Sequence, residues 1–192
     1  MKPGSWVMLA AGLAMAAPAM AQDLPNLREA RNLVFAEDGA IEWEIFTGGI
    51  LSETDILTLD QINQIQPQAY YGAMAIAPDE GIAAQTTALT ANYHNEDGAR
   101  AAALAACEAV RDGEGAACVI VMVIRPEGWE PGRALQLSSE ASAALRTEYR
   151  VLPRRSRAMA TSLATGQWGL GESREAALAA CDAADCEVVV EG

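Results

Sequence analysis

The segment Ala102-Ala103-Leu104-Ala105-Ala106-Cys107 recurs unchanged as Ala176-Ala177-Leu178-Ala179-Ala180-Cys181, and this pair decides the fold prediction. Ahead of each copy stand an Ala-Met-Ala triplet, at residues 73–75 and 158–160, and a glycine turn. Behind each copy a second cysteine, Cys118 or Cys186, opens a run of β-branched residues. Short alanine-rich matches arise by chance, but four features in one order indicate a duplicated strand, strand, helix, strand unit.

Two such ββαβ-like units predict an α+β fold, in which the tandem repeats form an antiparallel sheet with helices on one face. We place the first repeat at residues 69–125 and the second at 157–192. A loop and a helix over residues 126–156 connect them, and residues 69–192 together form one compact domain. Ser138-Ser139-Glu140 caps the connecting helix, which is expected to reach about Tyr149 and to end at Pro153.

The N-terminal part, residues 22–68, has its own pattern. Residues 33–35 and 41–46 are strand-like and flank a turn at residues 37–39, which predicts a hairpin. Ser52 and Asp55 have the spacing of a capping box, so a helix is expected to begin there and to end at Pro67.

Residues 1–21 have the pattern of a signal peptide. Lys2 is followed by an apolar stretch and then by Ala19-Met20-Ala21, a typical cleavage signal. We therefore expect a periplasmic or secreted protein whose mature chain begins at Gln22, the alternative being an uncleaved anchor. No later segment reaches the ~20 apolar residues that a bilayer span needs, so no membrane span is expected after cleavage.

The composition of the mature chain excludes several functions. Lys2 is the only lysine, and the mature chain sets 12 arginines against 26 acidic residues, a net charge of −14. This charge repels phosphate backbones, so we expect no nucleic-acid partner. Without lysine the mature chain cannot form a Schiff base or supply a P-loop lysine. His94 is the only histidine, which excludes multi-histidine zinc sites. We expect neither a cofactor nor a metal.

Four cysteines in an exported chain indicate two disulfides, for which three pairings are possible. In each repeat one cysteine ends the helix and the other begins the next strand. We therefore predict Cys107 paired with Cys118 and Cys181 with Cys186, each stabilising the fold by about 2–3 kcal/mol. The alternative is a redox or metal site, but the sequence has no C-x-x-C motif.

One basic patch stands out in this acidic chain. Guanidinium groups bind carboxylate and phosphate bidentately, so the patch is a candidate site for an anionic ligand or an acidic partner. The alternative is that these arginines pair with the protein's own acids. Trp129, in a loop rich in proline and glycine, is a candidate exposed contact. The candidate residues of the patch are Arg146, Arg150, Arg154, Arg155, Arg157 and Trp129.

His94 lies in a polar stretch and is the one candidate for a general base or, beside Glu96 and Asp97, a metal ligand. We favour a structural interpretation of this stretch, in which Asn95 caps the next helix and the acids complement its dipole. A catalytic histidine needs a nucleophile or a partner, and none is indicated by the spacing.

The repeated Ala-Leu-Ala-Ala-Cys helix and the closing Asp185-Cys186-Glu187-Val188-Val189-Val190 resemble a family of small secreted proteobacterial proteins, whose shared region is catalogued as a domain of unknown function. Residues 70–73, 77–81, 125–131, 135–138 and 165–169 also resemble the family, so the likeness covers most of the mature chain. It implies no catalytic residue. Some members are named 5-aminolevulinate synthase, but that reaction needs pyridoxal phosphate bound to a lysine, which the mature chain lacks.

The sequence thus favours a non-enzymatic periplasmic module that binds a small anionic ligand or another envelope protein. One alternative is a small hydrolase that uses His94. Another is a structural spacer, in which the repeats bind no ligand.

Overall fold

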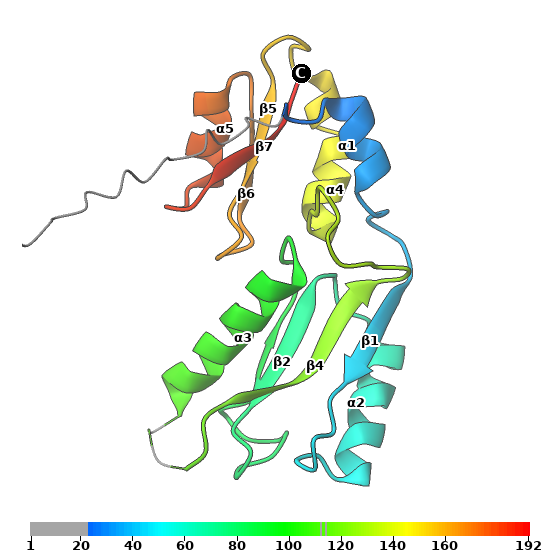
Figure 1. The fold of residues 1–192 in the computed structure, drawn as a ribbon, viewed down its shortest axis with the longest axis vertical. Helices are drawn as coiled ribbons and strands as arrows, with labels where there is room; N and C mark the ends of the chain where they lie inside the picture. Colours follow the sequence, from blue (N-terminus) through cyan, green and yellow to red (C-terminus); the bar gives the residue numbers. More distant parts are fainter. Residues whose placement is uncertain (1–22, 112, 114) are drawn as a thin grey trace, which may run out of the picture.

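The computed structural model describes residues 23–111, 113 and 115–192. The predicted signal peptide and Gln22 lie outside this range. The described chain has the predicted α+β fold and forms two units stacked along the long axis of the molecule (Figure 1). No helix in the described ranges is both long enough and apolar enough to cross a membrane.

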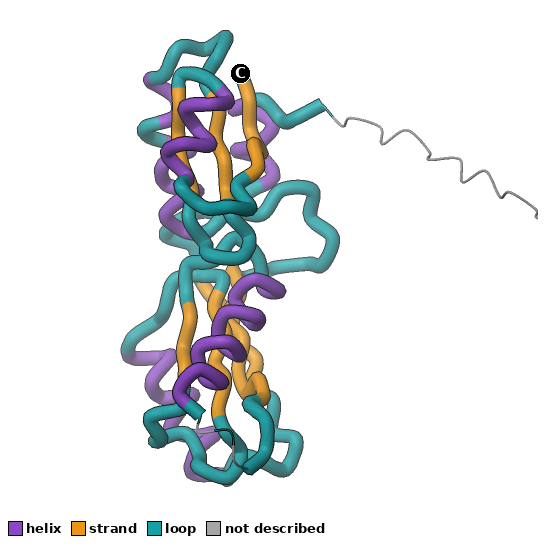
Figure 2. Tube along the Cα trace, turned by 90° about the vertical axis from the view of Figure 1, so that its left-hand side faces the viewer, coloured by secondary structure: helices purple, strands orange, loops and turns teal. Residues whose placement is uncertain are grey.

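The first unit is a four-stranded antiparallel sheet with the order β1-β4-β2-β3. Its strands are β1 (Ile41–Ile45), β2 (Gly72–Ile76), β3 (Ala88–Thr90) and β4 (Val119–Pro126). Helix α3 (Glu96–Val110) lies across the strands on the face turned to the viewer in Figure 2. Small residues let the helix approach the sheet closely, since Ala99, Ala103 and Cys107 are fully buried in one cluster with Ala73 and Ala75.

The second unit has the same order of elements, namely β5 (Ala158–Thr161), β6 (Trp168–Gly171), α5 (Arg174–Cys181) and β7 (Glu187–Glu191). Its strand order, β6-β5-β7, corresponds to β3-β2-β4 of the first unit. The pairing register shifts between Met74 and Ala75 in one unit and between Met159 and Ala160 in the other. The strands lie in two sheets rather than in the one sheet expected, and β1 occupies the edge beside β4 in the first unit.

Both predicted disulfides are confirmed. Cys107 is bonded to Cys118 and Cys181 to Cys186, and the Cα atoms of each pair are 6.2 Å apart. Each bond joins the end of a helix to the beginning of the next strand, as the pattern predicted. The bonds close loops with sequence separations of 11 and 5 residues.

The predicted N-terminal hairpin is wrong. Residues before the expected first strand, together with its first residue, form α1 (Leu27–Leu33), which begins at a capping box between Asn26 and Glu29. Strand β1 pairs instead with β4, with Ile41 opposite Pro126. The capping box explains the difference, because it satisfies the first free amides of a helix that begins just before the expected strand. The second capping box is as predicted, and Ser52 begins α2 (Glu53–Ile65).

The N-terminal part is divided between the two units. Helix α1 packs on the second unit and on α4 (Ser139–Arg146), where Ala30 and Val34 join a buried cluster with Leu145, Tyr149 and Val190. Helix α2 packs against the first sheet through the buried Leu59. One consequence is that α1 lies beside a segment more than 100 positions further along the chain.

Candidate anion-binding site

A groove of about 890 Å³ runs between α1, α4 and the short 3-10 helix η1 (Tyr149–Val151). We call it the arginine groove, because arginine is its commonest lining residue. The residues that line it are Asn26, Leu27, Arg28, Arg31, Asn32, Arg146, Arg150, Arg154, Arg157 and Gly192.

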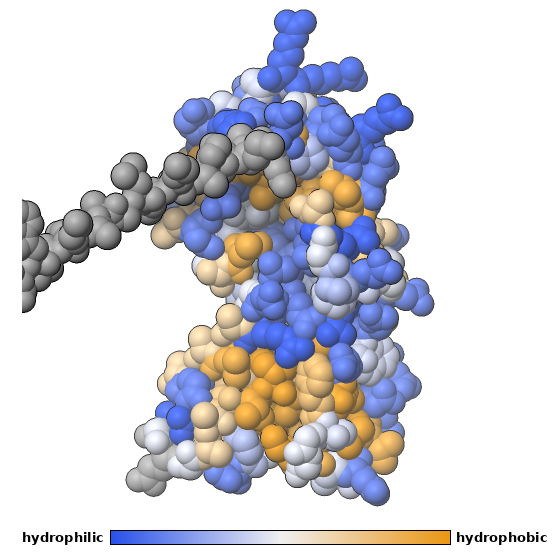
Figure 3. Space-filling view, in the orientation of Figure 1, coloured by the Kyte–Doolittle hydropathy of each residue, from blue (hydrophilic) through white to orange (hydrophobic). Residues whose placement is uncertain are grey.

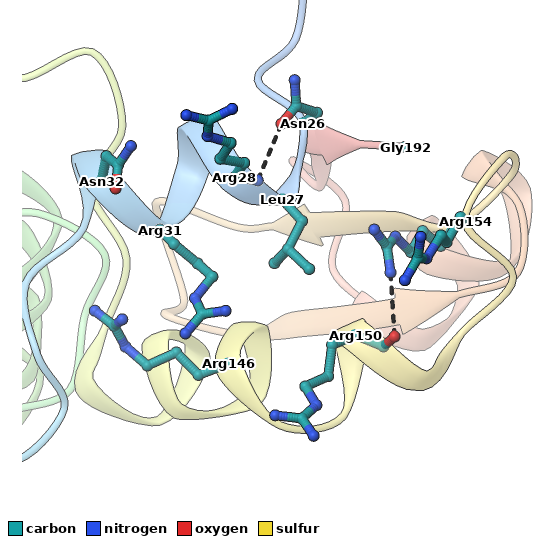
Figure 4. Close-up of a pocket in the computed structure, with 10 residues that line it drawn as sticks. Asn26, Leu27, Arg28, Arg31, Asn32, Arg146, Arg150, Arg154 and Gly192 are labelled. Atoms are coloured by element: carbon teal, nitrogen blue, oxygen red, sulfur yellow. Dashed lines mark hydrogen bonds between the residues drawn. The ribbon is translucent and has the colours of Figure 1, made fainter.

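Local structure accounts for the gathering of these charges. Arg28 and Arg31 are three positions apart on α1, so they lie one helical turn apart while Ala30 faces the core. Arg146 is in the last turn of α4, and Arg150 follows in η1. In Figure 4 the Arg31 side chain points from α1 toward that of Arg146, and Arg154 lies at the other end of the groove.

Arg157 is the most fixed of the six arginines. The residue is only 6% exposed, and its guanidinium lies 4.8 Å from the centre of the Tyr149 ring. Its Nη1 donates to the backbone oxygens of Tyr149 and Arg150, each at 3.3 Å. Its Nε is buried and has no hydrogen-bond partner in the described structure. Burial raises the pKa of Tyr149 to about 12, so its hydroxyl stays protonated and donates to the backbone oxygen of Arg157.

The arginines of the groove have almost no acidic partners. Among the described residues, only Arg146 of the six has a carboxylate within 4.0 Å, namely Glu37 at 2.8 Å. Elsewhere ion pairing is common, since Arg100, Arg111, Arg125 and Arg174 all have one. In a chain with 26 acidic residues the groove is therefore a local concentration of unneutralised positive charge.

The structure brings together four of the five arginines of the predicted patch. Arg155 is exposed and does not line the groove. Trp129 belongs to a different cluster, where its ring lies 4.7 Å from the Arg125 guanidinium and its Nε1 donates to Gln136. Sequence reasoning missed Arg28 and Arg31. The capping box of α1 was a readable signal for that helix, but nothing local to it indicated that α1 lies beside α4.

His94 is fully buried between the two units. Its Nδ1 accepts a hydrogen bond from the Ser138 backbone N–H at 3.1 Å, and its Nε2 lies 3.0 Å from the Gln167 backbone oxygen. These partners require a neutral ring protonated at Nε2. Burial lowers the pKa of His94 and so favours this neutral form. With both nitrogens bonded to backbone groups, the geometry lends no support to a hydrolase centred on His94.

The stretch after His94 has the predicted helix-start role. The Asn95 side chain accepts from the Gly98 N–H at 2.7 Å, and Glu96 and Asp97 occupy the first turn of α3. Among the described residues, no three His, Cys, Asp or Glu side chains are grouped as a metal site would need.

Comparison with known proteins adds no identification. No family model, no curated protein and no solved structure matches the chain. The resemblance to the family of secreted proteins therefore stays a prediction.

The surface of the second unit is in keeping with its groove. In Figure 3 this upper unit shows mainly hydrophilic residues, whereas hydrophobic residues gather over the lower unit. The arginine groove is lined from α1 and α4, which lie in this upper half of the molecule (Figure 1).

Proposed function

We propose that this protein is an exported, non-enzymatic module that binds an anionic ligand in the arginine groove. One observation carries the proposal: six arginines line a single groove, and five of them have no described carboxylate within 4.0 Å. Grouping like charges raises the free energy of the folded protein unless a counter-charge is supplied. An anionic ligand supplies it.

Arg157 supports the proposal independently of the net charge. Its guanidinium is held by two backbone oxygens and by the Tyr149 ring, so little side-chain entropy remains to be lost when a ligand binds. A guanidinium fixed in this way is suited to an anion that approaches through the groove.

The two disulfides support the exported location, because structural disulfides persist mainly in oxidising compartments. The signal-peptide pattern of residues 1–21 agrees with it. The intact mass of the protein from its native host tests this point. A chain beginning at Gln22 and alkylated only after reduction is expected, and a full-length chain with free thiols would contradict export.

Titration calorimetry with inorganic phosphate, pyrophosphate and citrate tests the binding function. Binding is expected for the wild-type protein and is expected to weaken at least about tenfold in Arg154→Gln, because a charge-assisted contact is lost. Arg155→Gln is the matched control, since it makes the same charge change one residue away and outside the groove. Both arginines are exposed, so neither variant is expected to alter the melting temperature.

If no anion binds the wild-type protein, the proposal is wrong. Equal losses in the two variants would also contradict it, because they would show attraction to the general charge of the chain rather than to the groove.

A further inference from the structure

The lining of the arginine groove offers essentially one kind of recognition. Apart from its arginines it contains Asn26, Asn32, Leu27 and Gly192. The described lining has no acidic side chain, no hydroxyl side chain and no aromatic ring. Proteins hold nucleobases largely by stacking on aromatic rings, and here the nearby Tyr149 ring is already occupied by Arg157. The groove therefore selects for negative charge rather than for rings.

The positive charges are spread along the groove. Arg31 and Arg146 approach each other at one end, and Arg154 lies at the other (Figure 4). Arg157 is bonded to the backbone of η1 between α4 and Arg154. The volume of about 890 Å³ is near the upper end of the ~300–1,000 Å³ typical of small-molecule sites. A compact anion such as phosphate would contact one end and leave the arginines of the other end without a counter-charge.

Resting on the function proposed above, we propose that the ligand is a linear polyanion of the inorganic polyphosphate type, charged along its whole length and spanning both ends of the groove. Each added anionic group binds at a high effective concentration once the first is held. A ligand with a negative charge on every repeating group matches a groove wall whose arginines come from α1, α4, η1 and the following loop.

The acidic remainder of the chain sets the conditions for this binding. The Debye length is about 8 Å at physiological ionic strength, so distant carboxylates are largely screened while the arginines in contact are not. Affinity should fall as salt rises, and the fall should be steeper for a longer chain because more contacts are charged.

The test compares pyrophosphate, tripolyphosphate and a long-chain polyphosphate by calorimetry on the oxidised protein. Affinity per chain is expected to rise about a hundredfold or more from the shortest to the longest. Arg31→Gln and Arg154→Gln probe the two ends. For the long chain each variant is expected to lose about tenfold, whereas for pyrophosphate, which we expect at the end with Arg154 and the fixed Arg157, only Arg154→Gln should have an effect. Arg155→Gln serves again as the control.

The outcomes separate this inference from the proposed function. If pyrophosphate and the long chain bind equally well, and Arg154→Gln weakens both, the groove binds anions but the chain inference is overturned. If a sulfated oligosaccharide or a poly-glutamate peptide of matched charge binds tighter than polyphosphate, the ligand class is overturned. If no anion binds at all, the proposed function fails as well.

Discussion

Replacing His94 should reveal how strongly the two units are joined. The Ser138 N–H has the His94 ring as its only acceptor in the described structure, whereas the Gln167 oxygen also accepts from the Ser162 N–H at 2.8 Å. His94→Ala leaves the Ser138 N–H unpaired, at a cost of about 1–3 kcal/mol, and removes one of two bonds to Gln167, at about 0.5–1.5 kcal/mol. We therefore expect a loss of roughly 2–4 kcal/mol in the free energy of unfolding.

Two conservative variants separate the contributions of the two hydrogen bonds to this loss of stability. In His94→Asn the side-chain oxygen can take the place of Nδ1 and accept from Ser138, so only the smaller cost at Gln167 remains. In His94→Gln the side-chain amide can take the place of Nε2, which leaves Ser138 unpaired. The expected order of stability is wild type, then Asn, then Gln, then Ala.

The titration of His94 gives a second readout of the same contacts. Its pKa is lowered in the folded protein, so the unfolded chain binds the proton more readily. The stability contributed by the neutral ring is complete above the unfolded value of 6.5 and is lost as the pH falls below it toward the lower folded value. His94→Asn should lack this loss.

The assay is urea unfolding of the oxidised protein at pH values from 7.5 to 5, with the midpoint and the slope fitted separately. A loss well below 1 kcal/mol in His94→Ala would refute the reasoning. So would equal stability of the Asn and Gln variants, or a pH dependence that persists in His94→Asn.

Three further outcomes are expected. Gly98→Ala should cost about 1–3 kcal/mol in urea unfolding, because an added Cβ would lie 2.3 Å from the backbone oxygen of Leu163 in the other unit; an unchanged midpoint would contradict this. Replacing both cysteines of one disulfide by serine should cost about 3 kcal/mol in the first unit and about 2 in the second, as the loop lengths predict, and the reverse order would contradict the chain-entropy argument. Burial opposes ionisation of Glu96, but hydrogen bonds from Arg125 and Arg100 outweigh it and lower the pKa; its contribution to stability should therefore be lost as pH falls below 4.5, and Glu96→Gln should reduce that acid sensitivity.

The features that could be predicted from the sequence are those that local patterns determine. The alanine repeat places small residues at the equivalent buried positions Ala103 and Ala177, so the two helices and their cysteines could be assigned. Capping residues did the same for the helix starts at Ser52 and Ser138. Both disulfides followed, because each lies within one unit and depends on no contact between distant segments.

Long-range pairing could not be predicted in this way. The alternation of apolar and polar residues over Ile41–Ile45 correctly predicts a strand, but it does not indicate which strand pairs with it. Strand β1 pairs with β4 and not with the residues just before it in the sequence. The two glycines of β6 indicate a long-range contact of this kind. A Cβ at Gly169 or Gly171 would lie 2.2–2.3 Å from the backbone of α5, so those positions admit only glycine where the helix packs on the strand.

The arginine groove combines both kinds of information, which explains why only part of it was predicted. Its α4 and η1 side is a cluster in sequence, but its α1 side is brought there by backbone bonds from Glu191 to Pro25 and from Leu27 to Gly192, and by the burial of Ala30. Docking α1 adds two positive charges to a wall that already has four. Apolar burial must therefore offset repulsion between the arginines, although the chain as a whole has 26 acidic residues that could have neutralised them. Five of these six arginines have no carboxylate within 4.0 Å in the described structure, which is why we propose that an anion from outside is their partner.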